Sequence, residues 1–550
     1  MEGSHEDNNA ATDSPNKDLP QIDDVFQWVR SFGCYQKILY LGLNLLLTPL
    51  GLQFMLLVFG TGTPRFHCSM PNTTCPPGKC CNNCTSYEFD GPFTSAVSEW
   101  NLICDRAHIG ATVQSCFFIG MLLGSIPGGW LSDTFGRRKC LLIGSLMMLV
   151  FASGTYFADC PSLLALLRLF VGFFLVSVML CQYVYIIEIV GPRRRTLSGK
   201  LQDFFWDFAS FVGFSLAYLI RDWRMLILAT TMFIIPFLLS FRMLPETVRW
   251  LVANDRLHEA CNELMKYGGR KKKSLDRDQL MKFLEEVREN RKLETEKQGE
   301  RKYSPLDLFK TPKMRRRSVI LGFNWFVISM VYYGFYLYIT ALSGNIYFNF
   351  LYMGLLSIPN VPISLYLMQK FGRRIPFVGY MFAAALFSLS VLLVPTDKKK
   401  VVLAIAIVGR ILNSCTFNNV YLYTSELYPT VIRNVGIGFS SSCARVGAII
   451  SPYIVMLSQL PGLSETLPVA IFGICGLAAA VLSLWLPETI NSTIPQTIEE
   501  AEAEKEDFGL FGACGRKKFS PEENAQKEAN SYDMSPQEAQ MNLLSKDPNV

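Results

Sequence analysis

The sequence predicts an all-α membrane protein with twelve transmembrane helices in two pseudo-symmetric halves of six. Three observations carry this prediction: long uncharged runs, charged turns between them, and an internal repeat. Residues 107–132, 140–158 and 318–369 contain no Asp, Glu, Lys or Arg. Such runs can cross a bilayer, which needs about 20 apolar residues of helix. The 550-residue chain is 50% hydrophobic, which suits a membrane protein better than several soluble domains.

The repeat relates one half of the chain to the other. Four landmarks recur in the same order, 236 to 242 positions apart: Gly136 and Gly372, Glu188 and Glu426, Arg195 and Arg433, and Leu-Pro-Glu-Thr at 244–247 and 486–489. Four coincidences at a nearly constant offset indicate a parallel duplication of a six-helix unit.

A charged turn at residues 129–139 separates the second and third spans. Its basic residues place it on the cytoplasmic side by the positive-inside rule. Asp133 can accept hydrogen bonds from a helix terminus, and the arginines can hold acidic partners. We interpret the charges at the inner helix ends as contacts of a cytoplasmic gate, the alternative being that they only set topology. The gate residues are Asp133, Arg137, Arg138, Glu188, Arg193, Arg195, Glu426 and Arg433. Gln369 replaces Asp133 in the second turn, so we expect a weaker gate there.

The chain begins with a polar, acidic segment, residues 1–30, which has no apolar h-region and is expected to be disordered and cytoplasmic, with no cleavable signal peptide. Residues 25–36 are expected to form a short amphipathic helix on the membrane surface.

The N-terminal half is expected at residues 31–244. Its spans are expected at 38–59, 107–132, 140–158, 162–187, 201–220 and 224–243. Asn44, Thr48 and Gln53 interrupt the first span and either join helices or line a cavity. The fourth span is bracketed by Arg168 and Glu188.

A polar loop at residues 60–106 follows the first span and contains only three basic residues. It holds six cysteines: Cys68, Cys75, Cys80, Cys81, Cys84 and Cys104. Zinc ligation is one interpretation of their spacing. The low positive charge, the even count and the sequons at Asn72 and Asn83 favour a glycosylated, disulfide-bonded extracellular loop. Six cysteines leave 15 connectivities open.

The rest of the chain repeats the pattern. Residues 245–316 form a charged cytoplasmic linker with a helical pattern at 276–291. The second half is expected at 317–487, with two spans inside 318–369 and others at 375–394, 401–424, 435–457 and 466–486. Residues 488–550 are polar and expected to be a disordered tail, so that both termini are cytoplasmic.

The motifs together resemble a known family. The turn G-x-x-x-D-x-x-G-R-R at 129–138 resembles a signature of the major facilitator superfamily. With Ser98-Glu-Trp-Asn-Leu-Ile-Cys104, Asp222-Trp-Arg224, residues 244–250 and residues 426–434, the chain resembles the organic cation/anion/carnitine transporters of solute carrier family 22. The resemblance implies the major facilitator fold and polyspecific plasma-membrane transport of organic ions by alternating access.

The resemblance also marks positions that bear on substrate type. Organic anion and carnitine members carry Arg at the place of Arg445, whereas organic cation members carry Asp. Cation and carnitine members often have Glu where this chain reads Ser357-Ile-Pro359. Trp325 and Tyr332 match cavity positions of the family.

Two charges inside the predicted spans are candidate substrate contacts. Asp207 and Arg445 lie 238 positions apart, so they are equivalent in the two halves. Ionisable groups at mid-depth are costly and usually face a cavity or a partner. One interpretation is structural: the two charges neutralise each other or pair with neighbouring polar groups. The other is that Arg445 binds a carboxylate of the substrate and Asp207 an amine. Aromatic faces for that amine are expected from Trp206, Trp325, Tyr332 and Tyr421.

The sequence therefore predicts a transporter of small organic ions, with cations or carnitine-like zwitterions first. The alternatives are an organic anion exchanger and a receptor on the same scaffold. We find no metal-ligand cluster on the cytoplasmic side, no G-x-S-x-G elbow and no phosphate loop, so we expect neither an enzyme nor a cofactor. Topology explains the net charge of +6, and nucleic acid is not an expected partner. The expected partners are the substrate, the lipid bilayer and, as an open alternative, a co-transported or exchanged ion.

Overall fold

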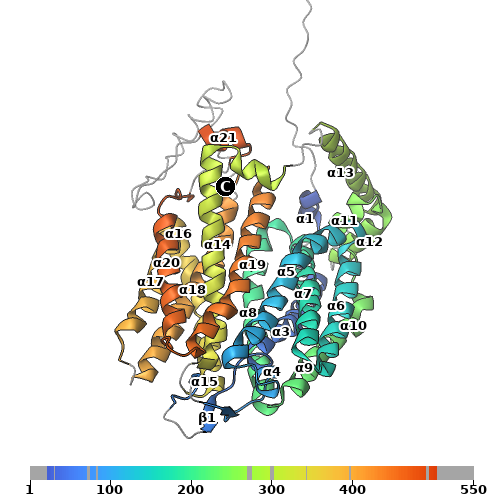
Figure 1. The fold of residues 1–550 in the computed structure, drawn as a ribbon. Coiled ribbons are helices and arrows are strands. Elements are labelled where there is room, and N and C mark those ends of the chain that lie inside the picture. The colour runs from blue at the N-terminus through green and yellow to red at the C-terminus, as the bar shows by residue number, and fades with distance from the viewer. Residues whose placement is uncertain are drawn as a thin grey trace, which may run out of the picture.

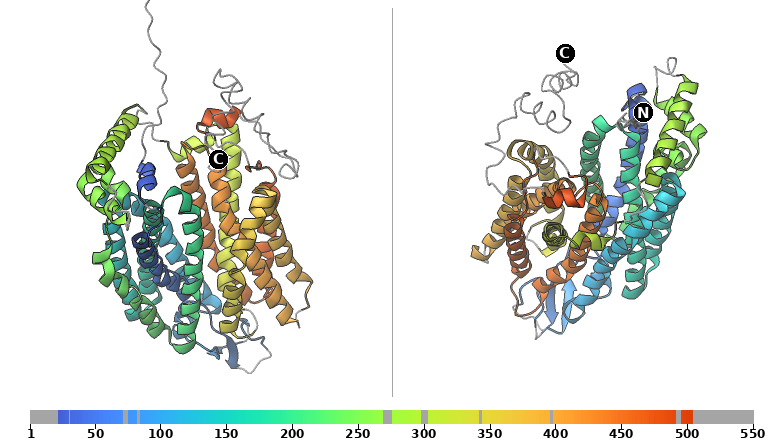
Figure 2. Two further views of the ribbon diagram at one scale, coloured as in Figure 1. Left: turned by 180° about the vertical axis from the view of Figure 1, so that it is seen from behind. Right: turned by 90° about the horizontal axis from the view of Figure 1, so that it is seen from above.

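Two helical bundles lie side by side in the computed structural model (Figure 1). The structure describes residues 22–29, 31–70, 75–81, 84–268, 276–297, 303–341, 344–395, 398–490 and 495–503, and the statements below refer to these ranges. The N-terminal half is drawn in blue and green and the C-terminal half in yellow to red, as Figure 2 shows from behind and from above.

The N-terminal half is built from eight helices. They are α2 (Cys34–Leu45), α3 (Leu47–Phe59), α5 (Ala107–Phe135), α6 (Arg137–Gly154), α7 (Pro161–Ile189), α8 (Arg195–Leu219), α9 (Trp223–Met232) and α10 (Ile235–Ser240). The C-terminal half is built from α14 (Pro312–Tyr338), α15 (Ile346–Ser357), α16 (Asn360–Phe371), α17 (Arg374–Ser390), α18 (Lys399–Leu427), α19 (Arg433–Met456) and α20 (Leu467–Ser483).

Shorter elements lie at the two ends of these bundles. They are α1 (Val25–Trp28), β1 (Phe66–Met70), β2 (Ser86–Phe89), α4 (Ala96–Glu99), α11 (Val248–Ala253), α12 (Leu257–Tyr267), α13 (Arg277–Lys297) and α21 (Ile498–Ala503). Short 3-10 helices are Ile22–Asp24, Cys104–Arg106, Thr155–Phe157, Pro192–Arg194, Phe241–Met243, Pro305–Phe309, Ile339–Ala341, Val391–Leu393 and Leu457–Gln459. We call the end with β1, β2 and α4 the loop side, and the end with α11 to α13 and α21 the linker side (Figure 1).

The helices agree with twelve membrane crossings. Ten helical segments of the described ranges are long and apolar enough to span a bilayer. Two further helices complete the twelve. The helix α8 is long enough but less apolar than the ten, because it contains Asp203 and Asp207. The helix α20 is apolar but has only 17 residues. The first crossing is formed by α2 and α3, the sixth by α9 and α10, and the eighth by α15 and α16, which are separated at Ile358–Pro359.

Two sequence-based expectations about the ends of the chain are wrong, and one about the linker is confirmed. The expected helix at 25–36 ends at Trp28, and Val25 and Val29 are buried against α11 to α13 because that linker presents its own apolar core. The helical pattern predicted at 276–291 in the linker is confirmed, because α13 begins at Arg277 and continues beyond residue 291. The segment after residue 487 is partly ordered, since α21 packs on α14 and Ala501 is fully buried.

The structure also places two charges deeper than expected. The helix α8 begins at Arg195 rather than near residue 201, so Asp207 lies 12 residues from its start (195 to 207). At 1.5 Å per residue that is about 18 Å, well inside the bundle. Arg168 does not bracket a span but is fully buried within α7, where its Nη1 donates to the side-chain amide oxygen Oε1 of Gln53 (3.3 Å).

Helices of each half approach closely where glycine leaves room. A Cβ on Gly120 of α5 would lie 1.9 Å from the Leu169 carbonyl of α7, and one on Gly172 would lie 2.1 Å from the Phe117 carbonyl. Gly447 of α19 meets the Phe326 carbonyl of α14 in the same way, at 2.1 Å. Small residues at such crossings let the backbones touch, which is how helices pack without a hydrophobic driving force in lipid.

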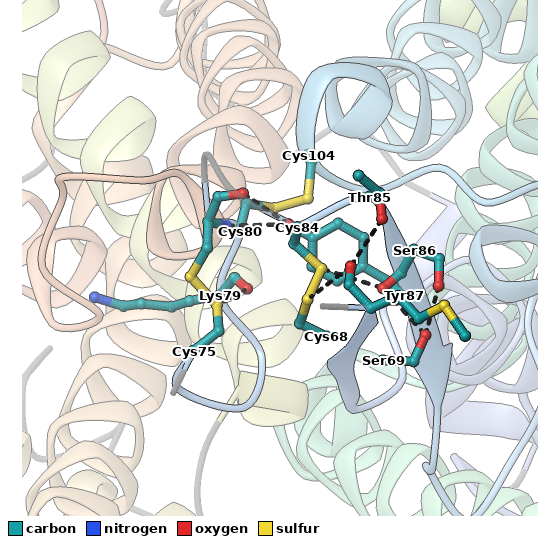
Figure 3. The surroundings of a disulfide bond; sticks show 12 residues. Cys68, Ser69, Cys75, Lys79, Cys80, Cys84, Thr85, Ser86, Tyr87 and Cys104 are labelled. Carbon is teal, nitrogen blue, oxygen red and sulfur yellow. Dashed lines mark hydrogen bonds between the residues drawn. A yellow bond between two sulfur atoms is a disulfide. The ribbon is translucent and has the colours of Figure 1, made fainter. Parts of the chain in front are cut away.

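The loop after the first crossing is a small disulfide-bonded unit. The strands β1 and β2 pair antiparallel, and the six cysteines form Cys68–Cys84, Cys75–Cys81 and Cys80–Cys104 (Figure 3). All six cysteines therefore form disulfide bonds, and none of them is a free thiol that could bind zinc. The sequon residues Asn72 and Asn83 lie outside the described residues, and their glycosylation stays a prediction.

Two motifs quoted from the sequence meet at this loop. Glu99 of α4 accepts hydrogen bonds from the Trp223 indole (2.7 Å) and from Arg224 (2.7 and 3.2 Å) at the start of α9. Trp100 packs edge-on against Trp223, with ring centroids 5.8 Å apart. The Arg224 guanidinium holds the pKa of the Glu99 carboxyl below its usual range. The loop is thus fixed to the rim of the N-terminal half.

The two halves are joined on the loop side. Ser115 of α5 donates to the Ile449 carbonyl of α19 (2.7 Å), and Arg65 donates to the Gly344 carbonyl (2.6 Å). The disulfide-bonded loop adds a contact of its own, because the Cys80 N–H donates to the Gln459 carbonyl (3.0 Å). These contacts hold the loop-side ends of the halves together.

Candidate functional site

A cavity of about 120 Å³ lies between the halves near mid-depth. Its walls come from α3 and α8 of the N-terminal half and from α14, α15 and α18 of the C-terminal half. Aromatic side chains dominate the lining: Phe54, Trp206, Phe214, Tyr332, Tyr333, Tyr336 and Phe350. The charged side chains in the lining are Asp203, Asp207 and Arg410. Two carboxylates and one guanidinium thus face an aromatic space.

Asp207 connects the two halves across this cavity. Ser357, at the end of α15, donates its hydroxyl to Asp207 Oδ1 at 3.0 Å. Asp203 lies one helical turn before Asp207 on the same face of α8, so the two carboxylates line the cavity together. The cavity therefore has a concentrated negative wall on α8.

Arg410 of α18 supplies the positive charge of the cavity. Its guanidinium lies over the rings of Tyr332 and Tyr336, 4.2 and 5.6 Å from their centroids. It interacts electrostatically with Asp207, but no ion pair within 4.0 Å joins the two in the described part of the chain.

The polar face of α18 continues from the cavity toward the linker side. Arg410, Ser414 and Asn418 line the cavity at helical spacing, and Tyr421 follows on the same face. Tyr421 is 44% exposed although it lies within a transmembrane helix, six residues before α18 ends at Leu427. Together with the closed loop side, this exposure indicates that the cavity faces the linker side.

A buried carboxylate organises the charged turn of the N-terminal half. Glu246, just after the sixth crossing, accepts the backbone N–H groups of Arg137 and Arg138 at 3.0 to 3.2 Å. Burial raises the pKa of Glu246, and these N–H groups act in the opposite direction. The Arg137 side chain binds Asp133 and Glu188, each at 3.0 Å.

The C-terminal half repeats this network with one member missing. Glu488 accepts the N–H groups of Arg373 (2.8 Å) and Arg374 (3.1 Å), and the Arg373 side chain binds Glu426 at 3.2 Å. Gln369 stands where Asp133 stands in the first turn, so the second arginine has one carboxylate partner instead of two. Each network lies within its own half in this conformation.

Comparisons with known proteins agree with the geometry. A family model described as sugar (and other) transporter matches residues 82–501. An organic cation transporter protein of Drosophila melanogaster is 32% identical over 92% of this chain and 97% of its own length. A solute carrier family 22 member 15-like protein of Xenopus tropicalis is 34% identical over 88% of this chain and 96% of its own.

The chain belongs to solute carrier family 22.

The fold agrees with that membership. The xylose transporter XylE from E. coli, in an inward open conformation, superposes with a TM-score of 0.61, at 16% identity and covering 85% of this chain and 99% of XylE. The protein is thus a multi-pass membrane transporter with the major facilitator fold, and not an enzyme.

In this family 22 member, only some of the substrate-binding residues predicted from the sequence line the cavity. Asp207, Trp206 and Tyr332 line it. Trp325 does not: it is 1% exposed, and its indole N–H donates to Thr424 Oγ1 at 2.9 Å. Tyr421 packs on Trp325, with centroids 4.4 Å apart, and lies beyond the cavity toward the linker side.

Arg445 is not in the lining of the cavity. It lies 12 residues from the start of α19 (433 to 445), which matches the position of Asp207 in α8. Because α19 packs on α5 and α14, Arg445 is buried behind Tyr333 instead of facing the cavity. No ion pair within 4.0 Å joins it to Asp207 among the described residues, so the two charges do not neutralise each other directly in this conformation.

The remaining gate residues have varied partners. Arg195 binds Asp23 of the N-terminal segment (2.6 Å), and Arg249 of α11 binds the same carboxylate (2.5 Å). Burial alone would raise the pKa of Asp23, but the two arginines outweigh it and lower that pKa. Within the part of the chain that the structure describes, the side chain of Arg433 donates to Thr430 of its own turn (3.3 Å). The side chain of Arg193 lies outside the described residues.

Three residues of the cavity and of the turn networks escaped the sequence analysis. Arg410 was detectable as the single charge between residues 401 and 425, inside a predicted span. Glu246 and Glu488 lie in the Leu-Pro-Glu-Thr landmarks, which were used as evidence of repetition without a role for the carboxylates. Asn44, Thr48 and Gln53 are all buried in the N-terminal half, and none of them lines the cavity.

Proposed function

We propose that this protein is a polyspecific plasma-membrane transporter of small organic cations and zwitterions that works by alternating access. The observation that carries the proposal is the aromatic cavity with Asp203 and Asp207 on one wall and a single guanidinium on the other. Its excess negative charge favours an ammonium group, and its rings offer faces for cation–π contact.

The family relatives support transport of organic ions in general. One relative is named an organic cation transporter protein and another a solute carrier family 22 member. Ser357 occupies the place where cation and carnitine members of the family often carry Glu. Asp207 on the facing helix brings a carboxylate to that place, since its Oδ1 lies 3.0 Å from the Ser357 hydroxyl. We infer that Asp207 takes over the ammonium-binding role.

We further propose that the linker side is cytoplasmic and that the described conformation faces inward. The basic turns on that side follow the positive-inside rule, and the disulfides of the opposite side suit an oxidising exterior. In this scheme the turn networks of Arg137 and Arg373 are rebuilt when the linker side closes, so they act as gate elements.

The test is uptake of three probes into cells that express the protein: tetraethylammonium, carnitine and benzoate, each with and without sodium. We expect uptake of tetraethylammonium or carnitine, and a KM at least tenfold higher in the Asp207→Asn variant, equivalent to about 1.4 kcal/mol. The exposed Asp105→Asn variant makes the same chemical change on the loop side and should leave the KM unchanged.

Uptake of benzoate alone would favour the organic anion exchanger. Saturable binding of a probe without uptake would favour the receptor. Either result, or an Asp207→Asn variant that behaves like Asp105→Asn at equal surface amount, would contradict the proposed function.

A further inference from the structure

Arg410 is a partly buried arginine with an unusual environment. Its guanidinium is stacked on Tyr332 at 4.2 Å and also lies over Tyr336 at 5.6 Å, both of which line the cavity. Arg410 lies in the interior of a helix, 11 residues from the start of α18 at Lys399. A guanidinium on two aromatic faces is held by the same force that holds an organic cation in an aromatic site.

The hydrogen-bond donors of Arg410 are incompletely used. Its Nε and one terminal nitrogen, Nη1, are buried and have no acceptor among the described residues. Buried donors are normally paired, and an arginine retained for structure alone usually has a carboxylate or carbonyl partner. Arg317 of α14 is an example in this chain, because it is 4% exposed and donates to the Leu427 carbonyl at 3.0 Å.

The negative groups of the cavity face this arginine from the other half. Asp207 belongs to α8 and Arg410 to α18, and they interact across the cavity without a direct ion pair. A positively charged substrate would need the same carboxylates and the same tyrosine faces that Arg410 uses. A substrate with a carboxylate would instead meet two unused N–H donors.

We propose that Arg410 is the charge selector of the cavity: a tethered cation that occupies the tyrosine faces, competes with purely cationic substrates and binds the carboxylate of zwitterionic ones. Its removal has opposite effects on the two substrate types. This inference rests on the proposed function in assuming that organic ions enter the cavity, and it adds the residue that divides them by charge.

The experiment measures dissociation constants of tetraethylammonium and carnitine on the purified full-length protein, wild type and Arg410→Gln. We expect the variant to bind tetraethylammonium roughly tenfold more tightly and carnitine roughly tenfold more weakly, about 1.4 kcal/mol in each direction. Unchanged constants, or equal weakening of both probes, would overturn the inference.

Three further variants separate the explanations. Arg106→Gln, at an exposed residue of the loop side, removes the same charge and should change neither constant. Arg445→Gln removes a charge one layer behind the cavity. If it shifts the dissociation constants of both probes as strongly as Arg410→Gln, then net charge and not the stacked guanidinium selects substrates, and the inference fails.

Arg410→Lys keeps the charge but loses planar stacking. We expect intermediate constants for it, and if Arg410→Gln does not fold, wild-type constants for Arg410→Lys overturn the inference.

The outcomes also distinguish this inference from the proposed function. If the wild type binds neither probe and takes up neither, the proposed function fails. If the wild type transports them and the Arg410 variants keep wild-type constants, only the charge-selector role fails.

Discussion

Replacing Gly136 by alanine tests whether the charged turn depends on a buried carboxylate. Gly136 ends α5 with φ 96° and ψ 154°, a backbone region that is essentially confined to glycine. An added Cβ would lie 2.3 Å from Glu246 Oε2, so the carboxylate would have to leave the N–H groups of Arg137 and Arg138. The strain costs about 1–3 kcal/mol. The weakened charge-assisted hydrogen bonds cost about 1.5–3 kcal/mol more.

The assay is the melting temperature of the detergent-purified protein, together with its transport rate at equal surface amount. We expect Gly136→Ala to lower the melting temperature by several degrees and to slow turnover. Gly129→Ala is the matched control, because an added Cβ there meets nothing within 4 Å and the residue lies inside α5. Alanine in a helix interior is favoured over glycine by about 0.5–1 kcal/mol, so the control should be neutral or slightly stabilised.

A double variant makes the reasoning stricter. Glu246→Ala removes the group that a Cβ at position 136 would strike, so Gly136→Ala should cost less in that background than in the wild type. Gly372→Ala should behave like Gly136→Ala, since its Cβ would lie 2.5 Å from Glu488 Oε2 at φ 90°. Equal melting temperatures for Gly136→Ala and Gly129→Ala would refute the argument.

Three further predictions follow from contacts outside the cavity. Arg224 lowers the pKa of Glu99, so their pair stabilises the folded protein above the ordinary carboxyl pKa of about 4.3. This stabilisation is lost as the pH falls through the lowered pKa. Between pH 7 and pH 3.5 the melting temperature should therefore fall less in Glu99→Gln than in the wild type. Trp325→Phe removes one buried hydrogen bond and should cost about 1 kcal/mol of stability in melting experiments while the substrate KM stays within twofold; a large KM change would place this residue in the substrate path. Arg65→Ala removes a donor to the Gly344 carbonyl and should shift the conformers toward opening on the loop side by roughly fivefold, which spin-label distances across that side would detect and an unchanged distance distribution would contradict.

Local sequence determined the crossings and the repeat. A run without charges can lie in a bilayer only as a helix, because every backbone polar group must be paired within the segment. The turns at Gly136 and Gly372 interrupt the helices where the sequence places charge and glycine, and the structure has helix ends there. The duplicated landmarks likewise predicted that Glu188 and Glu426 would hold equivalent places, and both bind the arginine of their own turn.

Only the tertiary structure decided which side chains meet. Asp207 and Arg445 are equivalent in the repeat, yet α8 lines the cavity while α19 is covered by α5 and α14, so one charge faces the cavity and the other is buried behind Tyr333. Arg410 was visible as a charge, but its tyrosine faces belong to α14, more than 70 positions earlier in the chain. Helical periodicity fixes which residues share a face of one helix. It does not fix how far that helix is rotated against its neighbours, and this rotation selects the residues that reach the substrate.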